Sequence, residues 1–176
     1  MVSIPVIAIT GSNGKTIVKE WLHHILSAEY AVVRSPRSYN SQIGVPLSLS
    51  LMSEAHQIAI IEAGISMPHE MEHLQKMIQP TIGIFTNIGD AHSQNFESIE
   101  QKIAEKMKLF AEVKSLIYCA DYRLIHAAAQ NIWCEKYAWS TTGNGTIHVQ
   151  MQNRDAKTTH ITIVQNAKKD VYTVPF

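Results

Sequence analysis

Short apolar runs alternate with helix-length amphipathic stretches up to about Trp139. Continuous apolar runs indicate strands buried on both faces, and regular alternation of strands with helices indicates parallel crossovers. Residues 1–139 therefore predict an α/β fold with a doubly wound, mostly parallel sheet. We expect strands at 6–9, 31–33, 58–61, 82–85 and 116–119, and helices near 15–28, 68–78, 97–112 and 122–130.

The pattern changes in residues 140–176. Residues 141–144 are rich in turn formers, and residues 146–152 and 158–164 alternate polar and apolar side chains with a period of two. Residues 153–155 are typical of a hairpin connection, and 171–174 suit a further strand. We expect a small antiparallel β-sheet here. No closing helix follows, so residues 1–176 are interpreted as one truncated domain.

Charge and composition exclude several classes of function. Fifteen Lys and Arg balance fifteen Asp and Glu among the 176 residues, which gives no electrostatic case for binding nucleic acid or an anionic membrane. No apolar run approaches the ~20 residues of a membrane span, and no signal-peptide pattern follows Met1. Cys119 and Cys134 form no CxxC pair. We expect a cytoplasmic protein.

A glycine-containing turn between the first strand and the first helix is the strongest local motif. Its two glycines let backbone N–H groups converge on phosphate oxygens, and the helix N-terminus adds positive potential. Lys15 would lie near the β- and γ-phosphates and the Thr16 hydroxyl would bind Mg²⁺. Ile9 stands where the general G-x-x-x-x-G-K-[ST] motif has its first glycine. We predict a nucleotide-phosphate site, a P-loop, built from Gly11, Ser12, Asn13, Gly14, Lys15 and Thr16.

This variant loop resembles the ATP loop of the Mur ligases and of their folylpolyglutamate synthetase relatives. Four further segments match motifs of that family in order and approximate spacing, namely 40–46, 61–64, 86–92 and 106–110. Residues 18–20 and Ala91 resemble most the branch that adds D-alanyl-D-alanine. The resemblance runs from about Val6 to Asp121.

The resemblance implies an ATP-dependent ligase of peptidoglycan precursor synthesis that works through an acyl phosphate. Its substrates would be UDP-N-acetylmuramoyl-tripeptide and D-alanyl-D-alanine, held with the help of flanking domains that these residues lack. The chain would then be the central ATP-binding domain alone and inactive by itself; in some bacteria the parent enzyme is fused to other enzyme domains. Another Mur-type ligase, a folylpolyglutamate synthetase relative and a P-loop small-molecule kinase are the alternatives.

The same resemblance assigns residues to the reaction. It implies two Mg²⁺ ions held by Thr16, Glu62, His92 and a carbamate on Lys106, with Lys15, Lys106 and His92 as catalytic groups. Asn40 and Asn87 would donate to phosphate or substrate oxygens. Glu62 ends an apolar run, and open α/β sheets bind ligands at the carboxyl ends of their strands.

Lys106 has an unusual position in its predicted helix. At about 100° per residue it falls near the middle of the apolar arc, and Lys102 falls near one side of that arc. Burial lowers the pKa of a lysine towards the neutral amine, and a neutral amine can take up CO₂ to form a carbamate. The alternative is a lysine that extends past the helix edge into water.

Residues 69–73 satisfy the zinc motif H-E-x-x-H. However, Met67, Met71, Leu74 and Ile78 define the expected apolar face, almost opposite both histidines. We therefore expect a solvent-exposed surface here, with Pro68 in the first helical turn.

Overall fold

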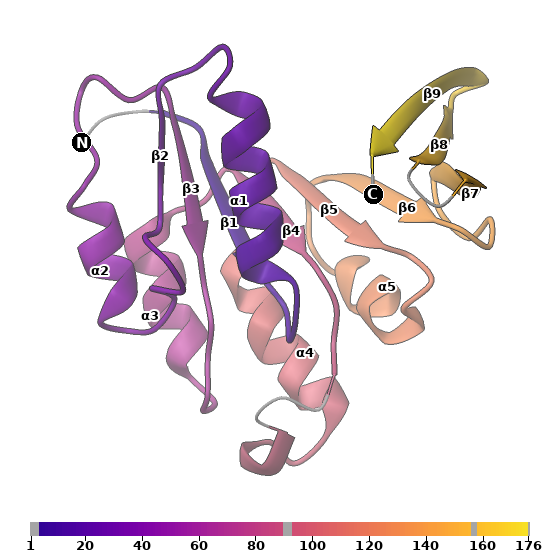
Figure 1. Ribbon diagram of the computed structural model, residues 1–176. Coiled ribbons are helices and arrows are strands. Elements are labelled where there is room, and N and C mark those ends of the chain that lie inside the picture. Colours follow the sequence, from indigo (N-terminus) through magenta and orange to yellow (C-terminus); the bar gives the residue numbers. More distant parts are fainter. Residues whose placement is uncertain (1–3, 90–92, 156–157, 176) are drawn as a thin grey trace.

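The computed structural model describes residues 4–89, 93–155 and 158–175 (Figure 1). Over these residues the strands form one sheet in the order β2-β3-β1-β4-β5-β6-β7-β8-β9, parallel from β2 to β7 and antiparallel from β7 to β9. The strands are β1 (Val6–Thr10), β2 (Val32–Arg34), β3 (Ile58–Glu62), β4 (Ile82–Phe85), β5 (Ser115–Cys119), β6 (Glu135–Ser140), β7 (Ile147–Asp155), β8 (Thr158–Gln165) and β9 (Lys168–Pro175). The helices are α1 (Lys15–Leu26), α2 (Gly44–Leu49), α3 (Glu70–Ile78), α4 (Ile99–Met107) and α5 (Arg123–Ala129), with 3₁₀ turns at Ser93–Asn95 and Lys108–Phe110.

Helices cover both faces of the parallel sheet. On one face, α1 packs Val18, Leu22 and Leu26 against Ile7 and Ile9 of β1. On the other face, apolar side chains of α2 to α5 join the larger core cluster. Strand β1 is buried along its whole length, as its unbroken apolar sequence predicts, and the doubly wound fold is confirmed.

The antiparallel pairing expected for the C-terminal strands is confirmed for β7 to β9, but these strands extend the main sheet and do not form a small sheet of their own. β7 continues the main sheet because it pairs in parallel with β6, over Trp139–Ile147 and Ser140–His148. Residues 153–155, expected in a hairpin connection, belong to β7 instead. Helix α2 and strand β6 were not predicted: α2 is only six residues long, and β6 mixes charged with aromatic residues.

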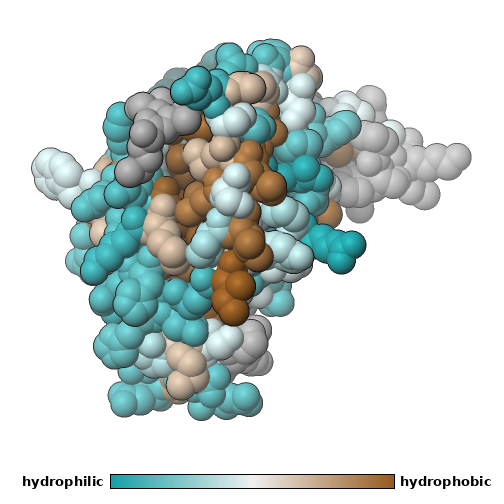
Figure 2. Space-filling model, turned by 90° about the vertical axis from the view of Figure 1, so that its left-hand side faces the viewer, coloured by the Kyte–Doolittle hydropathy of each residue, from teal (hydrophilic) through white to brown (hydrophobic). Residues whose placement is uncertain are grey.

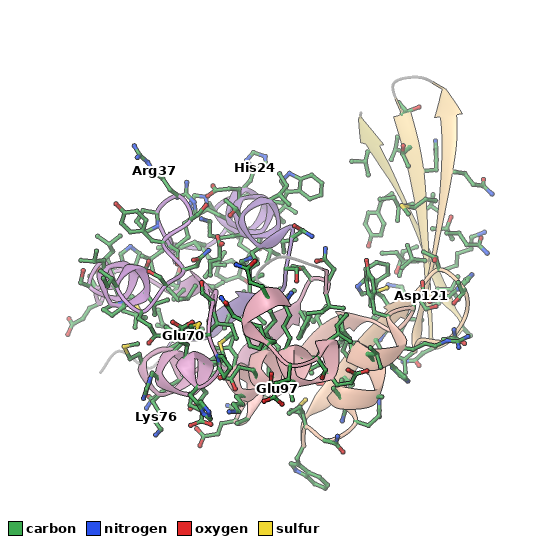
Figure 3. The ribbon with its side chains drawn as sticks, turned by 90° about the horizontal axis from the view of Figure 1, so that it is seen from below. His24, Arg37, Glu70, Lys76, Glu97 and Asp121 are labelled. Carbon is green, nitrogen blue, oxygen red and sulfur yellow. The ribbon has the colours of Figure 1, made fainter. Side chains whose placement is uncertain are left out.

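Asp121 fastens the turn between β6 and β7. Its carboxylate accepts hydrogen bonds from the hydroxyls of Ser140, Thr141 and Thr142, at 2.5, 2.8 and 2.6 Å. Viewed from the carboxyl edge of the sheet, Asp121 lies near the base of the antiparallel strands (Figure 3). These bonds hold the pKa of Asp121 well below its usual range. With its oxygens occupied by the turn, Asp121 has a structural role.

One side of the molecule carries a band of hydrophobic surface (Figure 2). This is the side where β2 forms the edge of the sheet and α2 lies (Figure 1). Large apolar side chains exposed on and beside α2 recur at helical spacing, namely Ile43, Leu47 and Leu51. No helix among the described residues is long and apolar enough to cross a membrane.

Candidate nucleotide-binding site

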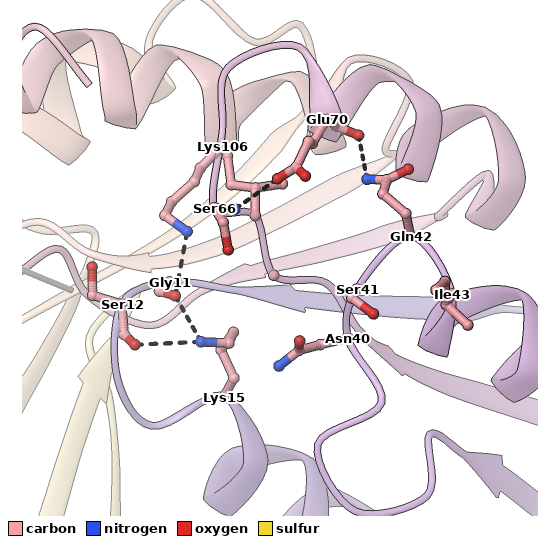
Figure 4. A pocket seen from close by; sticks show the side chains of 12 residues that line it. Gly11, Ser12, Lys15, Asn40, Ser41, Gln42, Ile43, Ser66, Glu70 and Lys106 are labelled. Carbon is pink, nitrogen blue, oxygen red and sulfur yellow. Dashed lines mark hydrogen bonds between the residues drawn. The ribbon is translucent and has the colours of Figure 1, made fainter. Parts of the chain in front are cut away.

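A pocket of about 240 Å³ opens at the carboxyl edge of the sheet, beyond the ends of β1 and β3 (Figure 4). Parallel strands β1, β3 and β4 end side by side at Thr10, Glu62 and Phe85. The segments that follow these strands therefore meet at one place, as the sequence predicts. The pocket is lined by Gly11, Ser12, Lys15, Asn40, Ser41, Gln42, Ile43, Gly64, Ile65, Ser66, Glu70 and Lys106.

The glycine loop after β1 is held rigidly against the segment after β4. Gly11 has φ 144°, and a Cβ there would lie 2.0 Å from Oγ1 of Thr86. The backbone N–H of Ser12 donates to the carbonyl of Asn87, and that of Asn13 donates to the Asn87 side-chain oxygen, both at 2.9 Å. These two N–H groups are therefore used within the chain. Asn87 contacts the loop, and its expected contact with phosphate or substrate stays a prediction.

The N-terminus of α1 points into this loop. Gly14 precedes the helix in the left-handed region, at φ 80°, and no side chain in the described part of the chain caps the helix. The first N–H groups of a helix lack intrahelical acceptors and attract anions. Lys15, the first helical residue, places its ammonium 3.0 Å from the carbonyl of Gly11. The loop thus combines an uncapped helix N-terminus with a cation, the arrangement predicted for phosphate binding.

Lys106 lies across the pocket from Lys15. Its ammonium is 3.5 Å from the Gly11 carbonyl, and the residue is only 3% exposed (Figure 4). Burial, and then the charges of Lys15 and Lys102, lowers the pKa of Lys106 to about 7. Burial also lowers the pKa of Lys15, against the opposing charge of Glu62. The buried position expected for Lys106 is confirmed, and Lys102 is buried as well.

Glu62 is the centre of a second group of side chains. Its Oε2 accepts from the Thr16 hydroxyl at 2.9 Å, and its Oε1 accepts from the Asn40 amide at 2.7 Å. The backbone N–H of Glu62 donates to Ser35 at 3.1 Å. Glu62 is almost fully buried, and these hydrogen bonds give its carboxylate a fixed orientation.

These oxygens suit Mg²⁺ better than a transition metal. Mg²⁺ is commonly bound through one or two protein oxygens together with substrate phosphates. Thr16 and Glu62 supply such oxygens beside the P-loop. Among the described residues no three His, Cys, Asp or Glu side chains form a metal-binding group. His92, expected at a second Mg²⁺, lies outside the described residues.

Lys19 was not predicted to be a site residue, yet it is completely buried and lies 3.6 Å from Glu62. The signal was present: Lys19 follows Lys15 by four residues and shares the helix face of Val18 and Leu22, which packs on the sheet. A lysine on an apolar face indicates a buried amino group, as it does for Lys106.

The zinc motif does not form a metal site. His69 precedes α3 with a left-handed backbone, and both it and His73 are exposed. As expected, Met71, Leu74 and Ile78 face the core. Two details were wrong: Met67 is half exposed, and Pro68 lies before the helix, which begins at Glu70.

Comparison with known proteins agrees with this geometry. The family model for the Mur ligase middle domain matches residues 9–175. The chain belongs to the Mur ligase family. A relative from Bacillus subtilis, named UDP-N-acetylmuramoyl-tripeptide–D-alanyl-D-alanine ligase, is 32% identical over 161 residues, which are 90% of this chain and 35% of that protein. This Mur ligase chain spans about a third of that relative's length.

Solved structures show the same fold. The MurF ligase of Thermotoga maritima, in complex with ADP, has a TM-score of 0.84 at 24% identity, over 98% of this chain and 40% of that one. A folylpolyglutamate synthetase variant of L. casei has a TM-score of 0.70 at 12% identity, over 99% of this chain and 54% of that one. The α/β fold with antiparallel strands at its end is therefore that of the Mur ligase middle domain. The family match argues against the small-molecule kinase alternative.

Proposed function

We propose that this chain is the ATP-binding domain of a ligase that joins D-alanyl-D-alanine to UDP-N-acetylmuramoyl-tripeptide. The observation that carries the proposal is the uncapped N-terminus of α1, with Lys15 and Lys106 facing one pocket. The substrate assignment is supported by the name of the Bacillus subtilis relative, and the nucleotide by the ADP in the Thermotoga maritima enzyme. The rest of the substrate site would come from polypeptide outside these residues, so we expect the chain alone to be inactive.

In the proposed reaction, a substrate carboxylate oxygen attacks the γ-phosphorus of ATP and ADP leaves. The amine of D-alanyl-D-alanine then attacks the acyl carbon, loses a proton and displaces phosphate. Both steps bring anions together, so positioned cations contribute most of the catalysis. The Lys15 ammonium would bind phosphate oxygens, and the N–H groups that begin α1 would orient them.

Mg²⁺ would be held by Thr16 and Glu62, where it neutralises charge on the phosphates. In the same proposal, Lys106 acts after it has taken up CO₂. Its amine nitrogen would bond to the carbon of CO₂ and release a proton, which leaves an anionic oxygen donor. A pKa of about 7 supports this, because much of the amine is then neutral at physiological pH.

Calorimetric titration of the 176-residue chain with Mg²⁺ and a non-hydrolysable ATP analogue tests the nucleotide assignment. We expect weak binding by the wild type and its loss in Lys15→Ala. The control is Lys136→Ala, which should bind as the wild type does, because Lys136 lies in β6 and donates to the backbone carbonyls of Ile132 and Cys134. Equal binding by all three proteins, or none by the wild type, would refute the assignment.

The acceptor substrate needs a complete enzyme. In the Bacillus subtilis relative, residues 9–175 of this chain would replace the matching segment. We expect phosphate release that depends on D-alanyl-D-alanine and disappears with Lys15→Ala. Release supported only by a different amino acid or dipeptide would refute the substrate assignment and leave the nucleotide site intact.

A further inference from the structure

Lys19 is a buried cation that does not line the pocket. Its ammonium lies 3.6 Å from Oε2 of Glu62 and 3.3 Å from Oε1 of Glu20. It also donates a hydrogen bond to the backbone carbonyl of Arg37. A lysine withdrawn from water is costly unless it is paired. Lys19 meets this requirement with two carboxylates and one carbonyl drawn from three different segments.

The carbonyl of Arg37 belongs to the loop 35–41, which is part of the connection from β2 to α2, and Asn40 and Ser41 of this loop line the pocket. Arg37 itself has a left-handed backbone, at φ 47°. Towards the end of the loop, Asn40 donates its amide to Glu62 at 2.7 Å and accepts from the N–H of Gly64 at 2.8 Å. Lys19 therefore acts on Glu62 along two routes, directly by charge and indirectly through this loop.

On its other side Lys19 is linked to the surface of the molecule. Glu20 takes part in a second ion pair, in which Nε of Arg34 donates to Oε2 of Glu20 at 2.9 Å. Arg34 is the last residue of β2, directly before the loop 35–41. The ion pairs thus tie the P-loop helix to β2, which directly precedes the loop, and to β3, whose Glu62 accepts from Asn40 of the loop.

We propose that Lys19 is a positioning residue for the nucleotide-bound cation: it holds the Glu62 carboxylate and the loop 35–41 in the geometry that binds Mg²⁺. The inference rests on the proposed function, since it requires a cation bound beside the P-loop. Lys19 is too deeply buried to touch the nucleotide itself, so its effect passes through Glu62 and Asn40.

Two simpler roles for Lys19 make different predictions. If Lys19 only repelled the cation through its charge, its removal would strengthen cation binding, because like charges repel. If Lys19 only stabilised the fold, its removal would weaken all forms of nucleotide binding together. Positioning predicts a third result, in which cation binding weakens while nucleotide binding without metal is retained.

The test compares wild type, Lys19→Met and Lys19→Gln, with Lys136→Met as the matched control. Lys136 is partly buried, less deeply than Lys19, and like Lys19 it donates to backbone carbonyls, at 2.9 and 3.4 Å, but at the start of β6. Mn²⁺ binding in the presence of ADP is followed by electron paramagnetic resonance. ADP binding in excess EDTA is followed by calorimetry, and thermal unfolding reports on the fold.

We expect both Lys19 variants to weaken Mn²⁺ binding roughly ten- to hundredfold, the usual effect of losing a residue that orients a metal ligand. Their affinity for ADP in EDTA stays near that of the wild type, and Lys136→Met changes neither value. Unchanged or tighter Mn²⁺ binding, or a parallel loss of both affinities, overturns the inference. Absence of Mn²⁺ and ADP binding by the wild type instead refutes the proposed function, and this inference with it.

If neither Lys19 variant folds, the wild type still decides the question. Because Lys19 is fully buried, its ¹⁵N-labelled ammonium should exchange slowly enough to be detected by NMR. We expect its signal to shift when Mg²⁺ is added to the ADP complex, while that of Lys136 stays in place. A Lys19 signal unaffected by Mg²⁺ overturns the inference.

Discussion

Replacement of Lys106 by methionine should change how the stability of the protein depends on pH. The pKa of Lys106 falls from 10.5 to about 7 in the folded protein, and each unit corresponds to about 1.4 kcal/mol. The ionisation of Lys106 can therefore change the free energy of unfolding by about 5 kcal/mol at most. Because Lys106 is almost completely buried, solvent screening does not reduce this value greatly.

The number of protons bound by the folded and unfolded states sets the direction in which stability changes with pH. Below pH 7 the folded protein must keep a buried ammonium at Lys106, so wild type is destabilised relative to Lys106→Met. Between pH 7 and 10.5 the amine is neutral in the folded state and charged in the unfolded state, so the unfolded state binds more protons and stability rises with pH. From pH 6 to 9 wild type should gain about 3 kcal/mol relative to the variant.

Urea unfolding at pH 6, 7, 8 and 9, in buffers free of CO₂, measures this difference. Lys108→Met is the control, since Glu105 and Glu72 raise the pKa of Lys108 and its titration falls above this range. The difference in unfolding free energy between Lys108→Met and wild type should stay constant from pH 6 to 9. If wild type and Lys106→Met respond to pH in parallel, Lys106 is not a buried amine of low pKa and the reasoning is refuted.

Three other substitutions test separate parts of the account. Gly11→Ala should destabilise the protein by about 2 kcal/mol or more and abolish nucleotide binding, because of its positive φ and the clash with Thr86; normal urea unfolding and calorimetry would contradict this. Asp121→Asn should lower the midpoint of thermal unfolding at pH 7. The difference in midpoint between wild type and variant should shrink below about pH 4, because protonation of the wild-type carboxylate removes its stabilising effect; a difference independent of pH would count against the turn assignment. Glu62→Gln should weaken Mn²⁺ binding with ADP while ADP binding in EDTA persists; unchanged Mn²⁺ affinity would remove Glu62 from the cation site.

The parallel part of the fold could be predicted because its strands are unbroken apolar runs. Strands such as β1 and β3 are buried on both faces, so their sequences need no alternation. Strand β6 escaped prediction because, nearer the edge of the parallel region, its residues are mixed in character and partly exposed. The parallel pairing of β6 with β7 involves two residue pairs, and no local pattern indicates it.

The site could be predicted where polar or charged residues end an apolar strand or directly follow it. Lys15, Thr16 and Glu62 follow or end apolar runs, and parallel pairing brings them to one edge. The contacts of Asn87 with the P-loop could not be predicted, since they depend on the close approach of two loops far apart in the chain. Lys19 could have been found from its place on the apolar face of α1.

The most direct test of the central claim is a crystal structure of the chain with Mn²⁺ and a non-hydrolysable ATP analogue, with Mn²⁺ located by anomalous scattering. We expect phosphates at the loop from Gly11 to Thr16 and an anomalous peak within coordination or water-bridged distance of Thr16 and Glu62. Phosphates bound elsewhere, or a metal peak remote from these two side chains, would contradict it.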